Sequence, residues 1–197
     1  MSLRPAIWRR SSVSLRKTLR ARRRALPEAD QSRHAVLVCR HLFRSALVLR
    51  GRVAAYAAFD GELDLWPFIA RHPRIVLPVI LSATRMTFRP HRVGDALRTN
   101  RFGIVEPLPG RPVGPLALDA VLTPLVGFSE DGSRLGMGAG YYDRRFAARK
   151  RPAMIGIAHE LQRVDTLPRR EWDVPLDAVV TERGWRCFTA RGRSMLL

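Results

Sequence analysis

The residues whose types and spacing are best suited to ligand binding are three glycines at alternate positions, Gly136, Gly138 and Gly140, between Arg134 and Asp143. Glycine has no Cβ atom, so such a loop can adopt positive φ angles and bring several backbone N–H groups close to an anion. Arg134 can donate two parallel hydrogen bonds to phosphate oxygens, and a carboxylate such as Asp143 is the oxygen ligand that Mg²⁺ takes beside a nucleotide. The segment therefore predicts a phosphate site. The alternative is a glycine-rich turn between a strand and a helix, because short glycine motifs are common.

The surroundings of this loop favour the phosphate site, although they match neither a P-loop nor the dinucleotide-binding spacing. Residues 117–126 form a continuous apolar run that predicts a strand, and residues 141–150 are expected to be helical. The positive end of that helix dipole would face the same anion. Strand, loop and helix in this order are what a ligand site at the carboxyl edge of a sheet requires.

The rest of the chain alternates between helical and strand patterns. We expect helices over residues 12–25, 28–49 and 65–71, and strands over residues 52–59, 74–81, 87–92, 154–158 and 178–181. Residues 105–115 contain four prolines and two glycines, so they should be mostly loop. The alternation predicts an α/β fold, a three-layer sandwich with a largely parallel sheet.

Length and composition indicate one globular domain. The chain has 197 residues, 46% of them hydrophobic, and we expect a single domain over residues 12–197 after a flexible extension at residues 1–11. No apolar run approaches the roughly 18 residues of a membrane span. The two cysteines, Cys39 and Cys187, favour a cytoplasmic location, and the spacing of cysteines and histidines does not match a zinc site.

The net charge of +18 raises the possibility of a nucleic-acid-binding module. Lys17 and Lys150 are the only lysines, so the excess is almost wholly arginine and is equally well explained by coding bias. We expect no dedicated nucleic-acid or membrane partner, and we interpret the arginine run at residues 20–24 as a solvated helix face. A salt-titrated binding assay would distinguish the two alternatives.

The glycine segment, read from Arg134 to Arg144, resembles the signature of 5-formyltetrahydrofolate cyclo-ligases. Other segments resemble this family in the same order: Arg22-Arg23-Arg24-Ala25-Leu26-Pro27, Phe59-Asp60-Gly61-Glu62-Leu63-Asp64, Gly103-Ile104-Val105-Glu106-Pro107, Leu122-Thr123-Pro124-Leu125-Val126-Gly127-Phe128 and Glu171-Trp172-Asp173-Val174-Pro175-Leu176-Asp177. The family's fold is similar to that of sugar-phosphate isomerases and CoA-transferases, which form a rival enzymatic interpretation. The segment around Glu62 and the paired tyrosines speak against that rival.

The resemblance implies the reaction and its requirements. The family uses ATP and Mg²⁺ to convert 5-formyltetrahydrofolate to 5,10-methenyltetrahydrofolate, with release of ADP and phosphate, through a phosphorylated formyl group (an iminium phosphate). The protein's task is then mainly to position the phosphoryl group and neutralise its charge, with no covalent nucleophile. We expect a cytoplasmic monomer whose partners are a reduced folate and ATP.

The resemblance also implies roles for individual residues. Those expected to bind ATP are Arg16, Lys17, Arg134, Leu135, Gly136, Met137, Gly138, Ala139, Gly140, Tyr141 and Tyr142. Arg134 and Tyr141 are the expected catalytic residues, Ala57, Glu62 and Tyr141 are expected to contact the folate, and Asp143 and Asp173 to bind the metal. Glu62 would accept hydrogen bonds from the pterin N–H groups.

Three positions carry open alternatives. The basic residue that the family usually has four positions before Arg16 falls at Ser12 here, so Arg10 or Arg20 could take its place. Asp173 could instead form a structural salt bridge with an arginine. His159 follows an expected strand, and we interpret it as structural.

Overall fold

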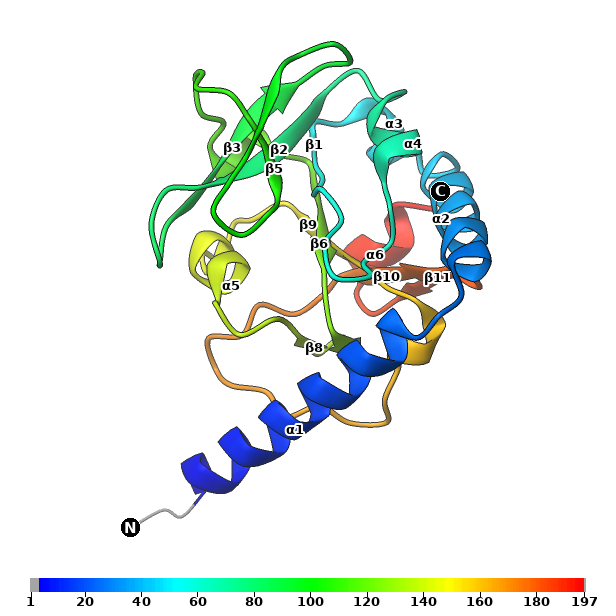
Figure 1. The fold of residues 1–197 in the computed structure, drawn as a ribbon, viewed down its shortest axis with the longest axis vertical. Helices are drawn as coiled ribbons and strands as arrows, with labels where there is room; N and C mark the ends of the chain where they lie inside the picture. Colours follow the sequence, from blue (N-terminus) through cyan, green and yellow to red (C-terminus); the bar gives the residue numbers. More distant parts are fainter. Residues whose placement is uncertain (1–3, 197) are drawn as a thin grey trace.

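A seven-stranded sheet forms the centre of the molecule (Figure 1). The computed structural model describes residues 4–196, with side chains from residue 12 onward except that of residue 47. Five strands run parallel in the middle, and β3 and β11 are antiparallel at the two edges, in the order β11-β10-β9-β6-β1-β2-β3. The strands are β1 (Val53–Ala54), β2 (Ile75–Ile80), β3 (Met86–His91), β6 (Ala120–Pro124), β9 (Ala153–Ile157), β10 (Ala178–Thr181) and β11 (Gly184–Cys187).

Helices cover both faces of this sheet, which confirms the predicted three-layer α/β sandwich (Figure 1). One face packs against α2 (Glu28–Leu42), α3 (Ala46–Arg50), α4 (Trp66–Ile69) and α6 (Ala190–Ser194). The other face packs against α5 (Tyr141–Phe146) and the loops around it. Each face of the sheet has its own hydrophobic core, and successive residues of a strand point into alternate cores. Val53 packs in the core on the α2 side and Ala54 in the core on the α5 side.

The first helix, α1 (Arg4–Arg24), extends away from the body of the molecule (Figure 1). It begins eight positions before the expected start at Ser12, so residues 4–11, assigned to a flexible extension, have helical backbone; residues 1–3 lie outside the described part. The helix ends before Pro27, which precedes α2. Over residues 4–196, no helix combines the length and apolar character needed to cross a bilayer.

Several predicted elements are shorter in the structure than in the sequence pattern. The helix expected over residues 28–49 is two helices, because Ser45 begins a new one by accepting a hydrogen bond from the Val48 N–H. The strand expected over residues 52–59 is only β1, and that over residues 117–126 is reduced to β6 after a 3₁₀ turn, η1 (Pro115–Ala117). The helix expected over residues 141–150 ends at Phe146, where the buried ring anchors α5 against Phe88.

Two small hairpins complete the fold. The proline-rich segment expected to be loop begins with β5 (Val105–Pro107), which pairs with β4 (Leu97–Thr99). After β6 the chain forms β7 (Gly127–Phe128) and β8 (Arg134–Leu135), and a second 3₁₀ turn, η2 (Glu160–Gln162), follows β9. The hairpin β7–β8 is what separates the buried strand β6 from the glycine loop.

Candidate active site

A cavity of about 610 Å³ opens at the carboxyl ends of β1, β2 and β6. Its walls come from the loop after β1, the β4–β5 hairpin, the loop between β8 and α5, and the segment around residues 168–173. The predicted site residues that line it are Arg16, Ala57, Glu62, Arg134, Leu135, Gly136, Met137, Gly138, Ala139, Gly140, Tyr141, Tyr142, Asp143 and Asp173. Predicted residues from four separate sequence segments therefore meet in one cavity large enough for a small-molecule ligand.

The glycine loop has the unusual backbone that its sequence predicts, at two of its three glycines. Gly138 and Gly140 have φ angles of +106° and +66°, which residues with a Cβ atom rarely adopt. A Cβ atom at Gly140 would also lie 2.8 Å from Nη1 of Arg144. Gly136 differs, because no atom lies within 4 Å of the position a Cβ atom would take there. At Gly136 the missing side chain leaves open space beside the loop.

The helix that follows this loop contributes less than expected. With only six residues, α5 has fewer aligned peptide dipoles than the predicted ten-residue helix. An anion at this loop would therefore be bound mainly by the loop N–H groups and by nearby arginines.

Arg16 reaches the glycine loop from α1. Its Nε donates to the carbonyl of Gly136 at 2.8 Å, and Nη1 lies 3.3 Å from Oγ of Ser12, the position where the family usually has a basic residue. Burial lowers the pKa of the Arg16 guanidinium, and the charge of Arg170 lowers it further, so two arginines face the same space. The structure does not bring Lys17 to this cavity: the side chain is exposed one position further round the helix.

Arg134 and Asp143 form a buried ion pair at the other side of the loop. Nη2 of Arg134 lies 2.5 Å from Oδ1 of Asp143, Nη1 donates to the carbonyl of Val174, and the Val174 N–H donates back to Oδ1 of Asp143 at 3.1 Å. The arginine side chain is 5% exposed, and burial lowers its pKa while the two aspartates, Asp143 and Asp173, oppose that change. The pair fixes the start of α5 to the segment that carries Asp173.

The two aspartates have the donor chemistry of a magnesium site. Mg²⁺ in nucleotide sites is held by one or two carboxylates together with phosphate oxygens and water. Asp173 lies close enough to Arg16 and Arg134 to act on the pKa of both, and its Oδ2 accepts the Arg170 N–H at 2.8 Å. Because Oδ1 of Asp143 is engaged by Arg134 and Val174, Oδ2 is the oxygen left for a metal. The residues present fit Mg²⁺.

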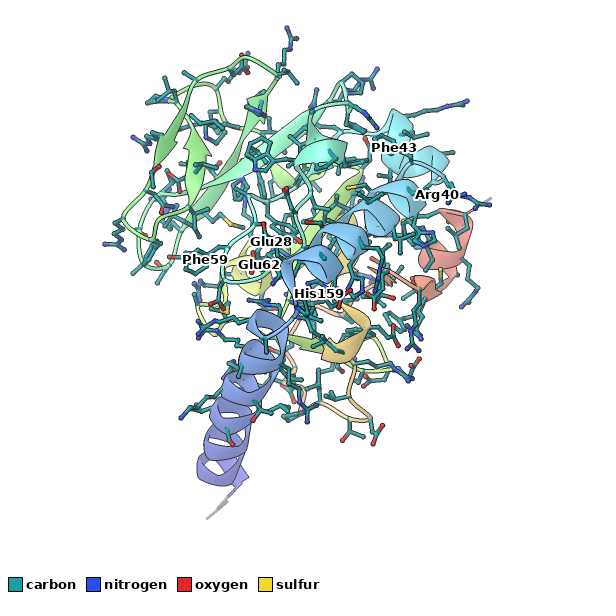
Figure 2. The ribbon with its side chains drawn as sticks, turned by 45° about the vertical axis from the view of Figure 1, so that its right-hand side comes forward. Glu28, Arg40, Phe43, Phe59, Glu62 and His159 are labelled. Carbon is teal, nitrogen blue, oxygen red and sulfur yellow. The ribbon has the colours of Figure 1, made fainter. Side chains whose placement is uncertain are left out.

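Glu62 lines the same cavity from the loop after β1 (Figure 2). Its Oε2 accepts the Phe59 N–H at 3.1 Å. Burial raises the pKa of the carboxyl group to about 7, although the charge of Arg23 opposes the rise. Burial also raises the pKa values of the neighbouring phenols Tyr56 and Tyr142, and the negative charge of Glu62 adds to this. Glu62 is therefore a half-buried acceptor poised between its two protonation states at neutral pH.

The turn that carries Glu62 is clamped by α1. Asp60, a non-glycine residue with a φ of +59°, pairs with Arg20, Arg23 and Arg24 at 2.8, 3.0 and 2.5 Å. Burial alone would raise the pKa of Asp60, but hydrogen bonds from Arg20 and Arg24 hold it at about 2. Arg23 is 1% exposed and also donates to the carbonyls of Asp60 and Leu125. The interpretation of this arginine run as a solvated face is thus wrong at Arg23.

The sequence pattern missed the β4–β5 wall of the cavity. Glu106 is buried there, and its Oε1 accepts hydrogen bonds from the Ile80 N–H and from Nδ2 of Asn100, both at 2.8 Å. These bonds attach the hairpin, with Phe102 and Ile104, to the end of β2. The Glu106-Pro107 segment was recognisable as family-like, but nothing local assigns it a place in the cavity. Trp172, 63% exposed with Arg170 stacked at 5.3 Å, was missed for the same reason.

Comparison with known proteins is consistent with this geometry. A 5-formyltetrahydrofolate cyclo-ligase from Escherichia coli strain K12 is 42% identical over 174 residues, covering 83% of this chain and 96% of the relative. A cyclo-ligase from Mycolicibacterium smegmatis is 30% identical, covering 88% and 95%. The solution structure of the Aquifex aeolicus 5,10-methenyltetrahydrofolate synthetase superposes with a TM-score of 0.80 at 31% identity, covering 90% of this chain and 92% of that one.

The family model reaches the same result over a continuous range. The model of the 5-formyltetrahydrofolate cyclo-ligase family matches residues 9–182, a range that spans the cavity-lining segments from Arg16 to Asp173. The sequence segments first identified by resemblance all lie within this range. The chain belongs to the 5-formyltetrahydrofolate cyclo-ligase family.

Proposed function

We propose that this protein uses ATP and Mg²⁺ to convert 5-formyltetrahydrofolate to 5,10-methenyltetrahydrofolate, releasing ADP and phosphate. Relatives and structural neighbours carry the names of enzymes for this conversion. The observation that carries the proposal is one cavity that is lined both by the glycine loop Gly136–Gly140 and by an acceptor, Glu62. One cavity can thus hold a nucleotide and a pterin with their reacting groups together.

The proposed chemistry needs positioning rather than a protein nucleophile. The oxygen of the formyl group on N5 attacks the γ-phosphorus of ATP. The bond between the γ-phosphorus and the oxygen that bridges it to the β-phosphate breaks, so ADP leaves. The phosphorylated formyl carbon is then attacked by N10, which loses its proton, and the C–O bond breaks to release phosphate. These steps leave the carbon joined to both nitrogens and consume one ATP.

In this scheme the arginines neutralise the phosphoryl group during transfer. Arg16 and Arg134 both line the cavity beside the glycine loop, and hydrogen bonds from guanidinium groups to phosphate are strong because they are charge-assisted. Tyr141 borders the same space, with its hydroxyl bonded to the carbonyl of Ser82 at 3.1 Å. Asp143 and Asp173 would hold Mg²⁺, which supplies charge neutralisation for the phosphates when bound.

Glu62 would orient the pterin. Its carboxylate oxygens accept hydrogen bonds, and the pterin ring presents N–H donors along one edge. Accepting these donors favours the ionised form, so folate binding would lower the pKa of Glu62 from its value of about 7. Folate binding should then strengthen as pH rises through neutrality.

The deciding experiment is to mix the protein with 5-formyltetrahydrofolate and MgATP and follow near-ultraviolet absorbance, because the methenyl product absorbs where the substrate does not. We expect product only when the ATP γ-phosphate can be transferred. Turnover with a non-hydrolysable ATP analogue would contradict the phosphorylation step. A cytoplasmic location and a monomeric state remain predictions.

A further inference from the structure

Three metal-binding side chains meet outside the cavity, on the α2 side of the sheet. His34 lies on α2, His159 directly after β9, and Glu182 directly after β10. One ligand atom from each lies within 4.8 Å of the others, and over residues 4–196 this is the only such group of three. None of them lines the cavity described above. The proposed reaction leaves this cluster without a role.

The spacing of the three ligand atoms suits a transition metal. Nδ1 of His34 lies 3.0 Å from Nδ1 of His159 and 3.8 Å from Oε2 of Glu182. Metal–ligand bonds of about 2.0–2.1 Å in tetrahedral geometry place neighbouring ligand atoms about 3.3 Å apart. The two observed distances lie on either side of this value, and the third, between His159 and Glu182, is at most 4.8 Å, so a side-chain movement of up to about 1.5 Å would complete the arrangement.

The surroundings provide a second, independent indication. Nε2 of His159 lies 3.4 Å from the carbonyl of Gly61, which fits the protonated nitrogen and leaves the Nδ1 lone pair directed at His34. Metal-binding histidines usually donate their other ring N–H to a carbonyl or carboxylate in this way. Oε2 of Glu182 accepts the Glu160 N–H at 3.0 Å, which fixes the carboxylate.

The buried histidine is held in the form that binds metals. His159 is 1% exposed, and burial, together with the charges of His34 and Arg23, lowers its pKa to about 4, while Glu182 opposes this. Its imidazole is therefore neutral near pH 7. Without a metal, the 3.0 Å contact requires one Nδ1 to donate to the other, and a metal bound to both Nδ1 atoms requires the His34 proton to lie on Nε2 instead.

We propose that His34, His159 and Glu182 form a binding site for a divalent transition metal of the zinc type. Two imidazoles and one carboxylate favour zinc over Mg²⁺, which prefers oxygen ligands. This site is separate from the magnesium position at Asp143 and Asp173. Because His159 bonds to Gly61, the residue before Glu62, the metal would also brace the turn that carries Glu62 (Figure 2).

The test is isothermal titration of Zn²⁺ into metal-free protein, without folate or ATP, so that the result is independent of the proposed reaction. We expect one saturable site per chain and a rise in melting temperature with Zn²⁺, because a ligand of the folded state stabilises it. His34→Gln and Glu182→Gln should each weaken this site more than tenfold. His41→Gln, which changes a histidine two turns along α2 outside the cluster, should leave it unchanged.

Circular dichroism would establish that the variants remain folded before titration. Absence of a saturable site in the wild-type protein would overturn the proposal. So would equal Zn²⁺ affinity in His34→Gln and wild type, or displacement of Zn²⁺ by equimolar Mg²⁺. In those cases the cluster is a hydrogen-bonded histidine pair.

Discussion

At the scale of single residues, Glu62 illustrates a conflict between binding and stability. The same burial that places its carboxyl group in the cavity raises its pKa from the ordinary 4.5 to about 7. A raised carboxyl pKa means that the folded state binds more protons than the unfolded state between these values. The folded protein therefore loses stability as pH rises from about 4.5 to about 7, and the loss is complete once Glu62 is ionised in the folded state as well.

We predict opposite effects of Glu62→Gln on folate binding and on stability. Loss of a charged acceptor facing pterin donors should cost about 1.5–3 kcal/mol of folate binding and barely change ATP affinity. Without ligand, the variant should melt at a higher temperature than wild type at pH 8, and the difference should vanish below pH 4.5. Calorimetric titration with each ligand and melting curves across pH measure both effects.

The outcome that would contradict this assignment is specific. If Glu62→Gln kept its folate affinity and lost its ATP affinity, Glu62 would contact ATP and not the folate. Equal melting temperatures of variant and wild type at pH 8 would show that the carboxyl group is not desolvated in solution.

Asp143 combines a structural and a functional role in one side chain. Asp143→Asn keeps the shape but removes the charge that pairs with the buried Arg134, so melting temperature should fall by several degrees. If Oδ2 also binds Mg²⁺, the rate should require more Mg²⁺ in the folded variant. The measurement is rate against Mg²⁺ concentration below the melting transition. Asp173→Asn provides the comparison for stability. The Asp173 carboxylate accepts the N–H of Arg170 in a local turn, whereas Asp143 forms an ion pair with a buried arginine.

At the scale of elements, α1 positions two parts of the site. Near its middle Arg16 contacts the glycine loop, and near its end Arg23 holds the Asp60 turn. The two contacts lie on the same side of the helix, seven residues apart, which is two helical turns. The helix therefore sets the separation between the glycine loop and the turn that carries Glu62.

We predict that Arg23→Ala impairs stability and folate use together. It leaves Asp60 short of a buried partner and removes bonds to two carbonyls, at a cost of about 3 kcal/mol. Because the Glu62 turn loosens, KM for folate should rise more than KM for ATP. Arg24→Ala removes an exposed partner of the same aspartate and should cost less than about 1 kcal/mol. Equal effects of the two substitutions would contradict the clamp.

Arg16→Ala tests the other end of the helix. ATP affinity should fall while folate affinity is retained, because a phosphate partner is lost and no pterin contact changes. Arg22→Ala removes the same charge from an exposed position on α1 and is the matched control. Similar losses in both variants would mean that general charge, not the contact at Gly136, attracts the nucleotide.

How far sequence predicts these elements depends on the sequence separation of the contacts. The glycine loop is a local pattern, so its residues were predicted directly, whereas the residues around Glu62 form an ordinary turn and Glu62 was assigned through the family resemblance. The Arg16–Gly136 contact spans 120 positions and required family resemblance, and the buried state of Arg23 was misjudged because Asp60 and Leu125 lie far from it in the chain. Short strands such as β1 are set by neighbours in the sheet rather than by their own residues. The His34–His159 pair, 125 positions apart, leaves no local signal at all.

At the scale of the whole molecule, some of the 35 lysines and arginines form internal ion pairs, and these pairs leave the net charge of +18 unchanged. Arg134 and Arg151 are paired with Asp143 and Asp177, and Glu160 pairs with Arg163 and Arg186. The remaining arginines create a diffuse positive field that attracts any polyanion. A diffuse field of this kind carries no sequence information, because sequence is read by contacts to base edges and not by charge alone.

We therefore predict that nucleic-acid binding is weak, independent of sequence and steeply salt-dependent. Affinity for unrelated duplexes should agree within about threefold and fall by orders of magnitude between 50 and 200 mM salt. Fluorescence anisotropy with labelled duplexes at several salt concentrations measures this. Tight binding to one sequence at physiological salt would instead indicate a second function.

The position of α1 also bears on the order in which the chain folds. This helix is synthesised before the segments that anchor it, because Gly136 follows Arg16 and Leu125 follows Arg23 by more than a hundred residues. Contacts between residues so far apart in the sequence form late, because closing a long loop loses chain entropy before the contact can stabilise the structure. The sheet and the helices on its α2 side can assemble before α1 docks. The glycine loop and the turn that carries Glu62 then reach their final separation only at the end of folding.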